Sequence, residues 1–164
     1  MELPKRKQNR LTEYDYRTPN AYFITICTND RNNLLWKDTG TYIACPESVP
    51  LTKLGIITRQ SITEIPNHYP MMSVDNFVIM PNHVHLLLQI NTDVNGRSMI
   101  APTISTVVRL MKGTVSKQAG FSVWQKGFYD HVIRNDNDYR DTWNYIEGNP
   151  SKWTEDKLYI SDSL

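Results

Sequence analysis

The sharpest chemical feature of the sequence is a pair of histidines separated by one residue. His83 and His85 lie in the run PNHVHLL, residues 81–87. In a strand, residues two apart point to the same face, so both imidazoles would project side by side. Neutral imidazoles so placed can bind one metal ion, although two hydrogen-bonded structural histidines would show the same spacing. The pattern therefore indicates either a metal site or a buried polar pair.

One class of enzyme is excluded by the residues that follow this pair. Histidine-triad nucleotide hydrolases use three histidines at alternate positions, and Leu87 occupies the third position here. The residue that would serve as their nucleophile is therefore missing.

A tyrosine and an asparagine form the second candidate pair. Tyr145 and Asn149 lie in the run WNYIEGNP, residues 143–150, and on a helix their spacing of four places them on one face. A phenol can act as a nucleophile toward phosphorus, and an amide oxygen could join the histidines at a metal ion. The chain has nine tyrosines, and a helical tyrosine usually packs, so the residue type alone is a weak signal. Tyr129 and Tyr139 are the alternative nucleophiles.

Hydrophobic periodicity predicts the elements that must position these residues. Strands are predicted at 21–28, 73–80, 83–90 and 128–134, with a small hairpin in which 34–36 and 41–43 flank residues 37–40. Helices are predicted at 51–65, 103–117 and 135–149, with Pro66 stopping the first and Asn135 or Asp136 capping the last. The order of strands and helices begins with the split β-α-β arrangement of ferredoxin-like (RRM-like) folds. We therefore expect an α+β fold with a four- to five-stranded, mostly antiparallel sheet, helices packed on it, and Tyr145 on the C-terminal helix.

Composition is typical of a single folded domain. The chain has 164 residues, of which 40% are hydrophobic and 21% charged, which excludes a disordered, collagen-like or coiled-coil protein. No run approaches the roughly 20 apolar residues of a membrane span, and the N-terminus has no secretory signal pattern. With only two cysteines, the cytoplasm is the expected compartment. We expect one domain over 1–164, with a basic arm at 1–13, a core at about 14–153 and a polar, peripheral tail at 154–164.

The distribution of charge is more informative than the net charge of +1. No acidic residue lies between Asp93 and Asp130, and the acids gather toward the C-terminus. The acid-free stretch carries the basic residues Arg97, Arg109, Lys112, Lys117 and Lys126. A polyanion would respond to this local positive field, although a solvated helix face would show the same pattern.

Taken together, four segments resemble the small single-tyrosine transposases of the HUH superfamily, and most closely the REP-associated tyrosine transposases and their relatives. The segments are residues 16–28 (YRTPNAYFITICT), 75–85 (DNFVIMPNHVH), 123–134 (VWQKGFYDHVIR) and 145–153 (YIEGNPSKW). They follow the order of the family and cover about residues 14–153. The ferredoxin-like fold of the family agrees with the one predicted from periodicity.

The resemblance implies a role for each candidate residue. His83 and His85 would be metal ligands, Asn149 the third ligand and Tyr145 the nucleophile. The DNA-binding residues would be Arg97, Arg109, Lys112, Lys117, Lys126, His131 and Arg134. With Mg²⁺ or Mn²⁺, such an enzyme cleaves single-stranded DNA beside hairpins through a 5′-phosphotyrosine and rejoins strands. The resemblance also implies a monomer or a homodimer.

Two other functions remain as alternatives. The chain could be a hairpin-DNA-binding module without catalysis, or a metal-dependent phosphoesterase acting on a small substrate. The presence of His83, His85, Tyr145 and Asn149 argues against the first, and the basic segment at 94–129 argues against the second.

Overall fold

Four antiparallel strands form the sheet in the part of the chain that the computed structural model describes, residues 20–37, 43–91 and 102–161. The strands are β1 (Ala21–Cys27), β2 (Met72–Ile79), β3 (His83–Ile90) and β4 (Tyr129–Val132). Their order across the sheet is β2-β3-β1-β4, and each neighbouring pair is antiparallel. This is the ferredoxin-like arrangement, so the α+β fold predicted from the sequence is confirmed.

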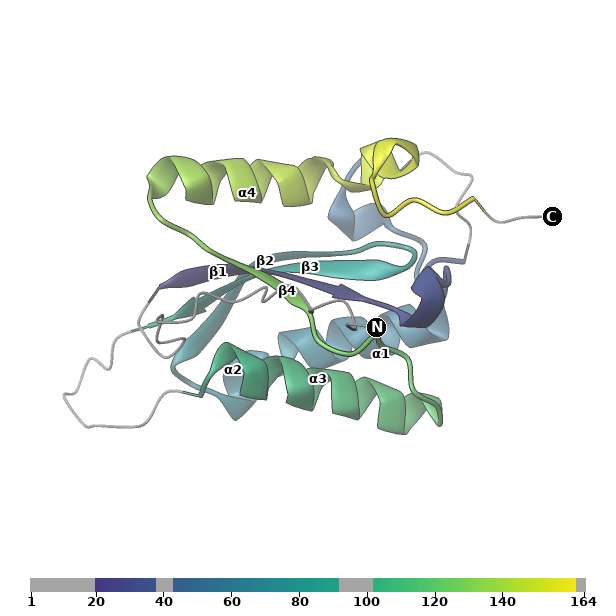
Figure 1. Ribbon diagram of the computed structural model, residues 1–164, viewed down its shortest axis with the longest axis horizontal. Helices are drawn as coiled ribbons and strands as arrows, with labels where there is room; N and C mark the ends of the chain where they lie inside the picture. The colour runs from purple at the N-terminus through teal and green to yellow at the C-terminus, as the bar shows by residue number, and fades with distance from the viewer. Residues whose placement is uncertain (1–19, 38–42, 92–101, 162–164) are drawn as a thin grey trace, which may run out of the picture.

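Helices cover both faces of the sheet. The helices α1 (Lys53–Thr63), α2 (Ile65–His68) and α3 (Ile104–Ala119) lie on one face. Helix α4 (Asp136–Gly148) and the 3₁₀ segment η3 (Pro150–Glu155) lie on the other, as Figure 1 shows. Two further 3₁₀ turns are η1 (Asn29–Arg31) and η2 (Pro46–Ser48). Among the described residues, no helix is long and apolar enough to cross a membrane.

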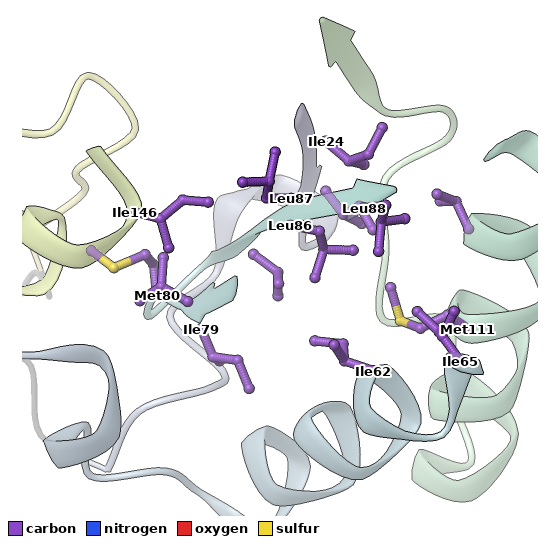
Figure 2. Packing of buried hydrophobic residues seen from close by; sticks show 14 of the residues in the cluster. Ile24, Ile62, Ile65, Ile79, Met80, Leu86, Leu87, Leu88, Met111 and Ile146 are labelled. Atoms are coloured by element: carbon purple, nitrogen blue, oxygen red, sulfur yellow. The ribbon is translucent and has the colours of Figure 1, made fainter. Parts of the chain in front are cut away.

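Strand β3 is central and is covered on both of its faces. Figure 2 shows Leu86 and Leu88 on the side of Ile62, whereas Leu87 lies toward Ile146 of α4. All five of these residues are at most 1% exposed. Burying each such side chain contributes about 1.5–3 kcal/mol, so β3 is held firmly between the two layers. A rigid central strand is a suitable support for the two histidines at its start.

Local sequence explains where the helices begin and end. Thr103 accepts a hydrogen bond from the Thr106 amide at the start of α3, and Asn135 accepts one from the Asp138 amide at the start of α4. Helix α3 ends at Ala119 and is followed by Gly120, whose φ of 81° is the left-handed conformation that glycine adopts at low cost. Of the two residues predicted as the cap of the last helix, Asn135 is the one that caps it.

Two local predictions differ from the structure. Trp36 pairs with Leu51 in an isolated bridge, and its indole donates to the Ile79 carbonyl, so no strand forms at 34–36; residues 38–42 of the expected hairpin lie outside the described residues. The helix predicted to run to residue 65 ends at Thr63. Pro66, expected only to stop it, occupies the first turn of α2, where its missing N–H costs nothing.

Candidate metal and nucleophile site

The two histidines lie side by side at the start of β3. In the antiparallel register, Thr25 of β1 is opposite His85 and Cys27 is opposite His83. The Nε2 atoms of the two histidines are 3.1 Å apart, and both residues are buried. The common face predicted from their spacing is therefore observed, and one small volume is bordered by both ring nitrogens.

Asn82 fixes the orientation of the first ring. Its Nδ2 donates to the carbonyl oxygens of Arg31 and Leu158, at 3.2 and 2.8 Å, which identifies the other amide atom as the oxygen. That oxygen lies 2.8 Å from Nδ1 of His83. Because an amide oxygen only accepts, Nδ1 of His83 must carry the proton. The Nε2 lone pair of His83 therefore faces the shared volume.

Thr25 supports the second ring with a more adaptable group. Its hydroxyl lies 2.8 Å from Nδ1 of His85 and can either donate or accept a hydrogen bond. When the hydroxyl accepts, Nδ1 of His85 carries the proton and Nε2 has a free lone pair. Both histidines can then present lone pairs to one point, which is the ligand form of the pair.

Burial keeps both rings neutral. It lowers the pKa of His83 to about 3, and the nearby Arg31 charge adds to the effect. Burial also lowers the pKa of His85 well below its usual range, with His83 and Lys157 as further causes. Neutral imidazole is the form that binds metal ions, so no proton has to leave these rings near neutral pH.

A carboxylate that the sequence interpretation missed completes the cluster. Asp156 Oδ2 is 3.8 Å from His83 Nε2, and ligand atoms of His83, His85 and Asp156 all lie within 4.8 Å of one another. The Asp156 side chain is only 4% exposed. The expectation of a peripheral tail after Trp153 is therefore wrong for this segment. The available signal was Trp153 itself, a large apolar side chain in a polar stretch, which is buried with its ring 6.0 Å from that of His83.

The donor set fits a divalent cation. Two imidazoles and a carboxylate converge here. In an octahedral ion with bonds of about 2.1 Å, two neighbouring ligand atoms would be about 3.0 Å apart. The two Nε2 atoms are separated by a similar distance, 3.1 Å. Asn149, at the end of α4, has a buried Oδ1 with no hydrogen-bond partner among the described residues. A buried acceptor of this kind would be satisfied by a cation.

Tyr145 extends from α4 over the histidine pair of the same chain. Its ring centroid is 5.2 Å from that of His85 and 5.9 Å from that of Phe23, and the residue is 44% exposed. Partial burial raises the pKa of Tyr145, the Asp156 charge raises it further, and a hydrogen bond with Asn149 lowers it. The phenol is therefore accessible to a substrate, and it is protonated near neutral pH.

The two alternative tyrosines differ in their surroundings. The Tyr139 hydroxyl donates to Asp75 at 2.8 Å, and burial together with that carboxylate raises its pKa to about 12. Tyr129 lies on β4, is 51% exposed and is opposite Thr25 in the β1–β4 register. Of the three phenols, Tyr145 has a ring contact with His85.

The basic residues named from the sequence do not form one cluster with the histidines. Arg109 and Lys117 are exposed on α3, on the opposite face of the sheet from Tyr145. Lys112 donates to the carbonyl oxygens of Gln125 and Gly127, at 2.6 and 2.8 Å, so two of its three donors hold the loop before β4.

The remaining basic candidates lie near β4 or outside the described residues. Lys126 is exposed in the loop before β4. His131 Nε2 lies 2.9 Å from Asp138, and Arg134 is exposed at the end of β4, with its backbone amide bonded to the same carboxylate. Arg97 lies outside the described residues.

Comparison with known proteins points to one family. The family model described as "Transposase IS200 like" matches residues 17–149. An uncharacterised protein of Haemophilus influenzae is 33% identical over 94% of this chain and 93% of its own length. A second H. influenzae protein, provisionally named a REP-associated tyrosine transposase, is 29% identical over 84% of this chain and 74% of its own length.

A solved structure shows the same fold. The REP-associated tyrosine transposase bound to a REP hairpin superposes with a TM-score of 0.59 at 21% identity, covering 94% of this chain and 92% of that one. The histidine pair and Tyr145 both lie within the segment that the family model matches.

Proposed function

Since the chain belongs to the family of IS200-like transposases, we propose that it cleaves single-stranded DNA beside a hairpin and rejoins the ends, with Tyr145 as the nucleophile. The observation that carries this proposal is the position of Tyr145 over His85, with the ring centroids 5.2 Å apart in the same chain. A phenol and a metal-binding pair can therefore act on one phosphate without a second subunit. The DNA substrate is further supported by the hairpin named in the structure of the similar transposase.

The metal would be held by side chains from three elements. His83 and His85 of β3, Asp156 after η3 and the Asn149 amide oxygen at the end of α4 are the proposed ligands. When bound, Mg²⁺ or Mn²⁺ would supply positive charge to a non-bridging oxygen of the scissile phosphate. Asn82 and Thr25 would keep the two imidazole lone pairs aimed at the ion.

The proposed reaction is a transfer of the phosphoryl group from a deoxyribose oxygen to tyrosine. Tyr145 Oη attacks phosphorus and loses its proton, while the bond from phosphorus to the 3′ oxygen breaks and that oxygen takes a proton from solvent. The products are a 5′-phosphotyrosine and a free 3′-hydroxyl. Attack by another 3′-hydroxyl on the phosphotyrosine reverses the step and joins strands without a nucleoside triphosphate.

Deprotonation of Tyr145 is the demanding part of this reaction. Partial burial and the negative charge of Asp156 both raise the pKa of the phenol. Neutralising Asp156 removes one of these two causes, so metal binding and nucleophile activation would be coupled through this carboxylate. Tyr145, rather than Tyr139, suits the role because Tyr139 is hydrogen-bonded to Asp75.

The proposed compartment and assembly follow from the same observations. Both cysteines are free thiols, which fits a reducing cytoplasm. Because the candidate nucleophile and ligands come from one chain, a monomer would be sufficient for cleavage, and a homodimer is not required by the site.

The test uses a DNA hairpin with single-stranded flanks, taken from the sequence that adjoins the gene, and Mn²⁺. We expect two products. The downstream DNA fragment should be linked to the protein in an adduct that resists denaturation, and the upstream fragment should carry a 3′-hydroxyl that a polymerase can extend. His85→Ala should bind the hairpin and form no adduct, because phosphate contacts carry most of the affinity. Binding without an adduct in any metal would indicate the silent DNA-binding module. Hydrolysis of small phosphate esters without an adduct would indicate the phosphoesterase.

A further inference from the structure

One half of the sheet face that carries the histidines is left open. Helix α4 packs against β2 and β3, whereas the side chains of β1 and β4 on that face remain at least partly exposed. These side chains, which we call the open sheet face, are Phe23, Thr25 and Cys27 of β1 and Tyr129 and His131 of β4. Figure 1 shows β4 on the edge of the sheet that borders this half.

The strand register connects this face directly to the candidate site. Thr25 is opposite His85 on one side and opposite Tyr129 on the other, so Tyr129, Thr25 and His85 form one row across three strands. Neighbouring strands lie about 4.8 Å apart, so Tyr129 is about 10 Å from His85 along this row. A strand of nucleic acid advances about 3.4 Å per nucleotide when stacked. A base roughly two or three nucleotides from a phosphate at His85 therefore reaches Tyr129.

The chemistry of the open sheet face suits a single strand of DNA. Tyr129 is 51% exposed, and an exposed aromatic ring on a sheet is a stacking surface for an unpaired base. None of the five side chains is a carboxylate. Near Cys27 the charges are mixed: burial raises the pKa of its thiol, Arg31 and Lys112 lower that pKa, and the Asp156 carboxylate raises it.

The opposite end of the face disfavours the same ligand. His131 faces the carboxylate of Asp138 at 2.9 Å, and the Arg134 backbone amide bonds to that carboxylate as well. A DNA strand leaving the histidine pair is therefore favoured toward the exposed Lys126 before β4 and is repelled by Asp138 at the other end. This polarity gives the strand one preferred direction across the sheet.

From these observations we infer that the single-stranded segment next to the cleaved phosphate lies over the open sheet face, with one of its bases stacked on Tyr129. The inference rests on the proposed function for the position of the phosphate and adds the path of the strand beyond it. Tyr129 is on this account a DNA-binding residue that positions the substrate, and it takes no part in the bond-making step.

The test compares two variants of Tyr129 in binding and in adduct formation. Tyr129→Phe keeps the ring, whereas Tyr129→Val removes it and keeps a residue that favours strands. The matched control is Phe121→Val, because Phe121 is similarly exposed, at 52%, but follows α3 in the other layer. The probe is a hairpin with a single-stranded flank, with iododeoxyuridine scanned through the flank for photocrosslinking.

We expect Tyr129→Val to bind the flanked hairpin about 5-fold to 150-fold more weakly, as loss of one stacked base predicts. Tyr129→Phe and Phe121→Val should bind like the wild type. In the wild-type protein, iododeoxyuridine at one position of the flank should crosslink to Tyr129. In the cleavage assay, the Tyr129→Val protein should still form the covalent adduct when the DNA is saturating. Adduct formation by a Tyr129→Val protein with wild-type affinity would overturn the stacking site and leave the proposed function intact.

The other outcomes separate the two claims. If Tyr129→Val weakens binding but no variant, including the wild type, forms an adduct, the strand path stands and the proposed catalysis fails. If the wild-type protein binds a hairpin with a flank no better than a blunt hairpin, the strand path is wrong.

Discussion

Thr25 and Asn82 hold the two histidines by hydrogen bonds of different kinds. The Asn82 amide is fixed by two backbone carbonyls, so His83 has one tautomer, whereas the Thr25 hydroxyl accommodates both tautomers of His85. Partners of this kind typically change metal affinity 10-fold to 100-fold. The metal-binding form of the pair therefore depends on Thr25 accepting a hydrogen bond.

Thr25→Val should lower the affinity for Mn²⁺ by about 10-fold or more, because Nδ1 of His85 loses its acceptor. Thr25→Ser keeps the hydroxyl and should bind Mn²⁺ within a few-fold of the wild type. Isothermal titration calorimetry measures both affinities directly. Equal Mn²⁺ affinity for Thr25→Val and the wild type would show that this hydroxyl does not orient the ligand.

The buried histidines also make stability depend on pH. The pKa of His83 is lowered to about 3 and that of His85 is lowered as well, whereas an unfolded histidine titrates near about 6.5. Between these values the unfolded chain binds more protons than the folded one. The free energy of unfolding of the metal-free protein should therefore fall as the pH falls below about 6.5, by at most about 1.4 kcal/mol per pH unit for each histidine.

Urea unfolding at several pH values between 7 and 4, in the presence of a chelator, measures this slope. A variant with both His83→Gln and His85→Gln should lose most of it, since no buried imidazole remains to protonate. A slope that is as steep in the double variant as in the wild type would mean that other groups cause the acid sensitivity.

At the scale of residues, spacing alone located the histidine pair, because alternation in a strand fixes a common face without any tertiary information. Their neutral state and tautomers depend on Asn82, Thr25 and burial, which no local pattern reveals. Asp156 was missed because a single aspartate in a polar stretch has no periodicity. Its position is decided by Trp153 and by the Leu158 carbonyl that Asn82 binds.

At the scale of elements, the segment that follows α4 has a functional role in this account. Segment η3 places Trp153 against the ring of His83 and leads the chain to Asp156. The Asn82 amide then holds Leu158, and Asn33 donates to the Ile160 carbonyl. These contacts fix the carboxylate beside the histidines.

Asp156→Asn should weaken Mn²⁺ binding by about 10-fold or more, because it replaces a charged ligand with a neutral one. It should also lower the pKa of Tyr145, since the Asp156 charge raises that pKa. Glu155→Gln is the matched control, because Glu155 is adjacent and exposed. Calorimetry gives the affinities, and ultraviolet titration of tyrosinate gives the pKa. Similar losses of Mn²⁺ affinity in both variants would indicate a general charge effect rather than a ligand.

The main elements were predictable because their patterns are long and regular. Alternation of Tyr22, Ile24 and Ile26 with less buried residues identifies β1. The buried apolar residues that recur every three or four positions identify the helix α3. The segment 34–36 was misassigned because Trp36 is held by the Ile79 carbonyl and by Leu51, which are distant in sequence. Contacts between remote residues decide such short segments.

At the scale of the whole molecule, the two faces of the sheet carry different features. The histidines and Tyr145 lie on the face of α4, whereas the exposed Arg109 and Lys117 lie on α3 across the sheet. A substrate that touched both would have to pass around an edge of the sheet. DNA with a folded hairpin and a single-stranded flank is large enough to do so.

Binding of such DNA should weaken with salt, and Arg109→Ala and Lys117→Ala should each reduce the slope of log affinity against log salt by about one. Lys112→Ala is a poorer probe, since Lys112 holds the Gln125 and Gly127 carbonyls and its loss would disturb the loop. Fluorescence anisotropy at several salt concentrations gives the slope. An unchanged slope in the double variant would place the DNA elsewhere, with the basic arm at residues 1–13 as the next candidate.

The central claim is that Tyr145 becomes covalently linked to the 5′ end of the cleaved DNA, and mapping of the linked peptide tests it most directly. Wild-type protein, Tyr145→Phe and the control Tyr139→Phe are incubated with the flanked hairpin and Mn²⁺, and the adducts are digested and identified by mass spectrometry. We predict a nucleotide attached to Tyr145 in the wild type and in Tyr139→Phe, and no adduct in Tyr145→Phe. The free energy of unfolding of Tyr145→Phe should differ from that of the wild type by at most about 1 kcal/mol, so a lost adduct would not reflect misfolding. A Tyr145→Phe protein that still forms an adduct, at Tyr139, Tyr129 or any other residue, would contradict the account.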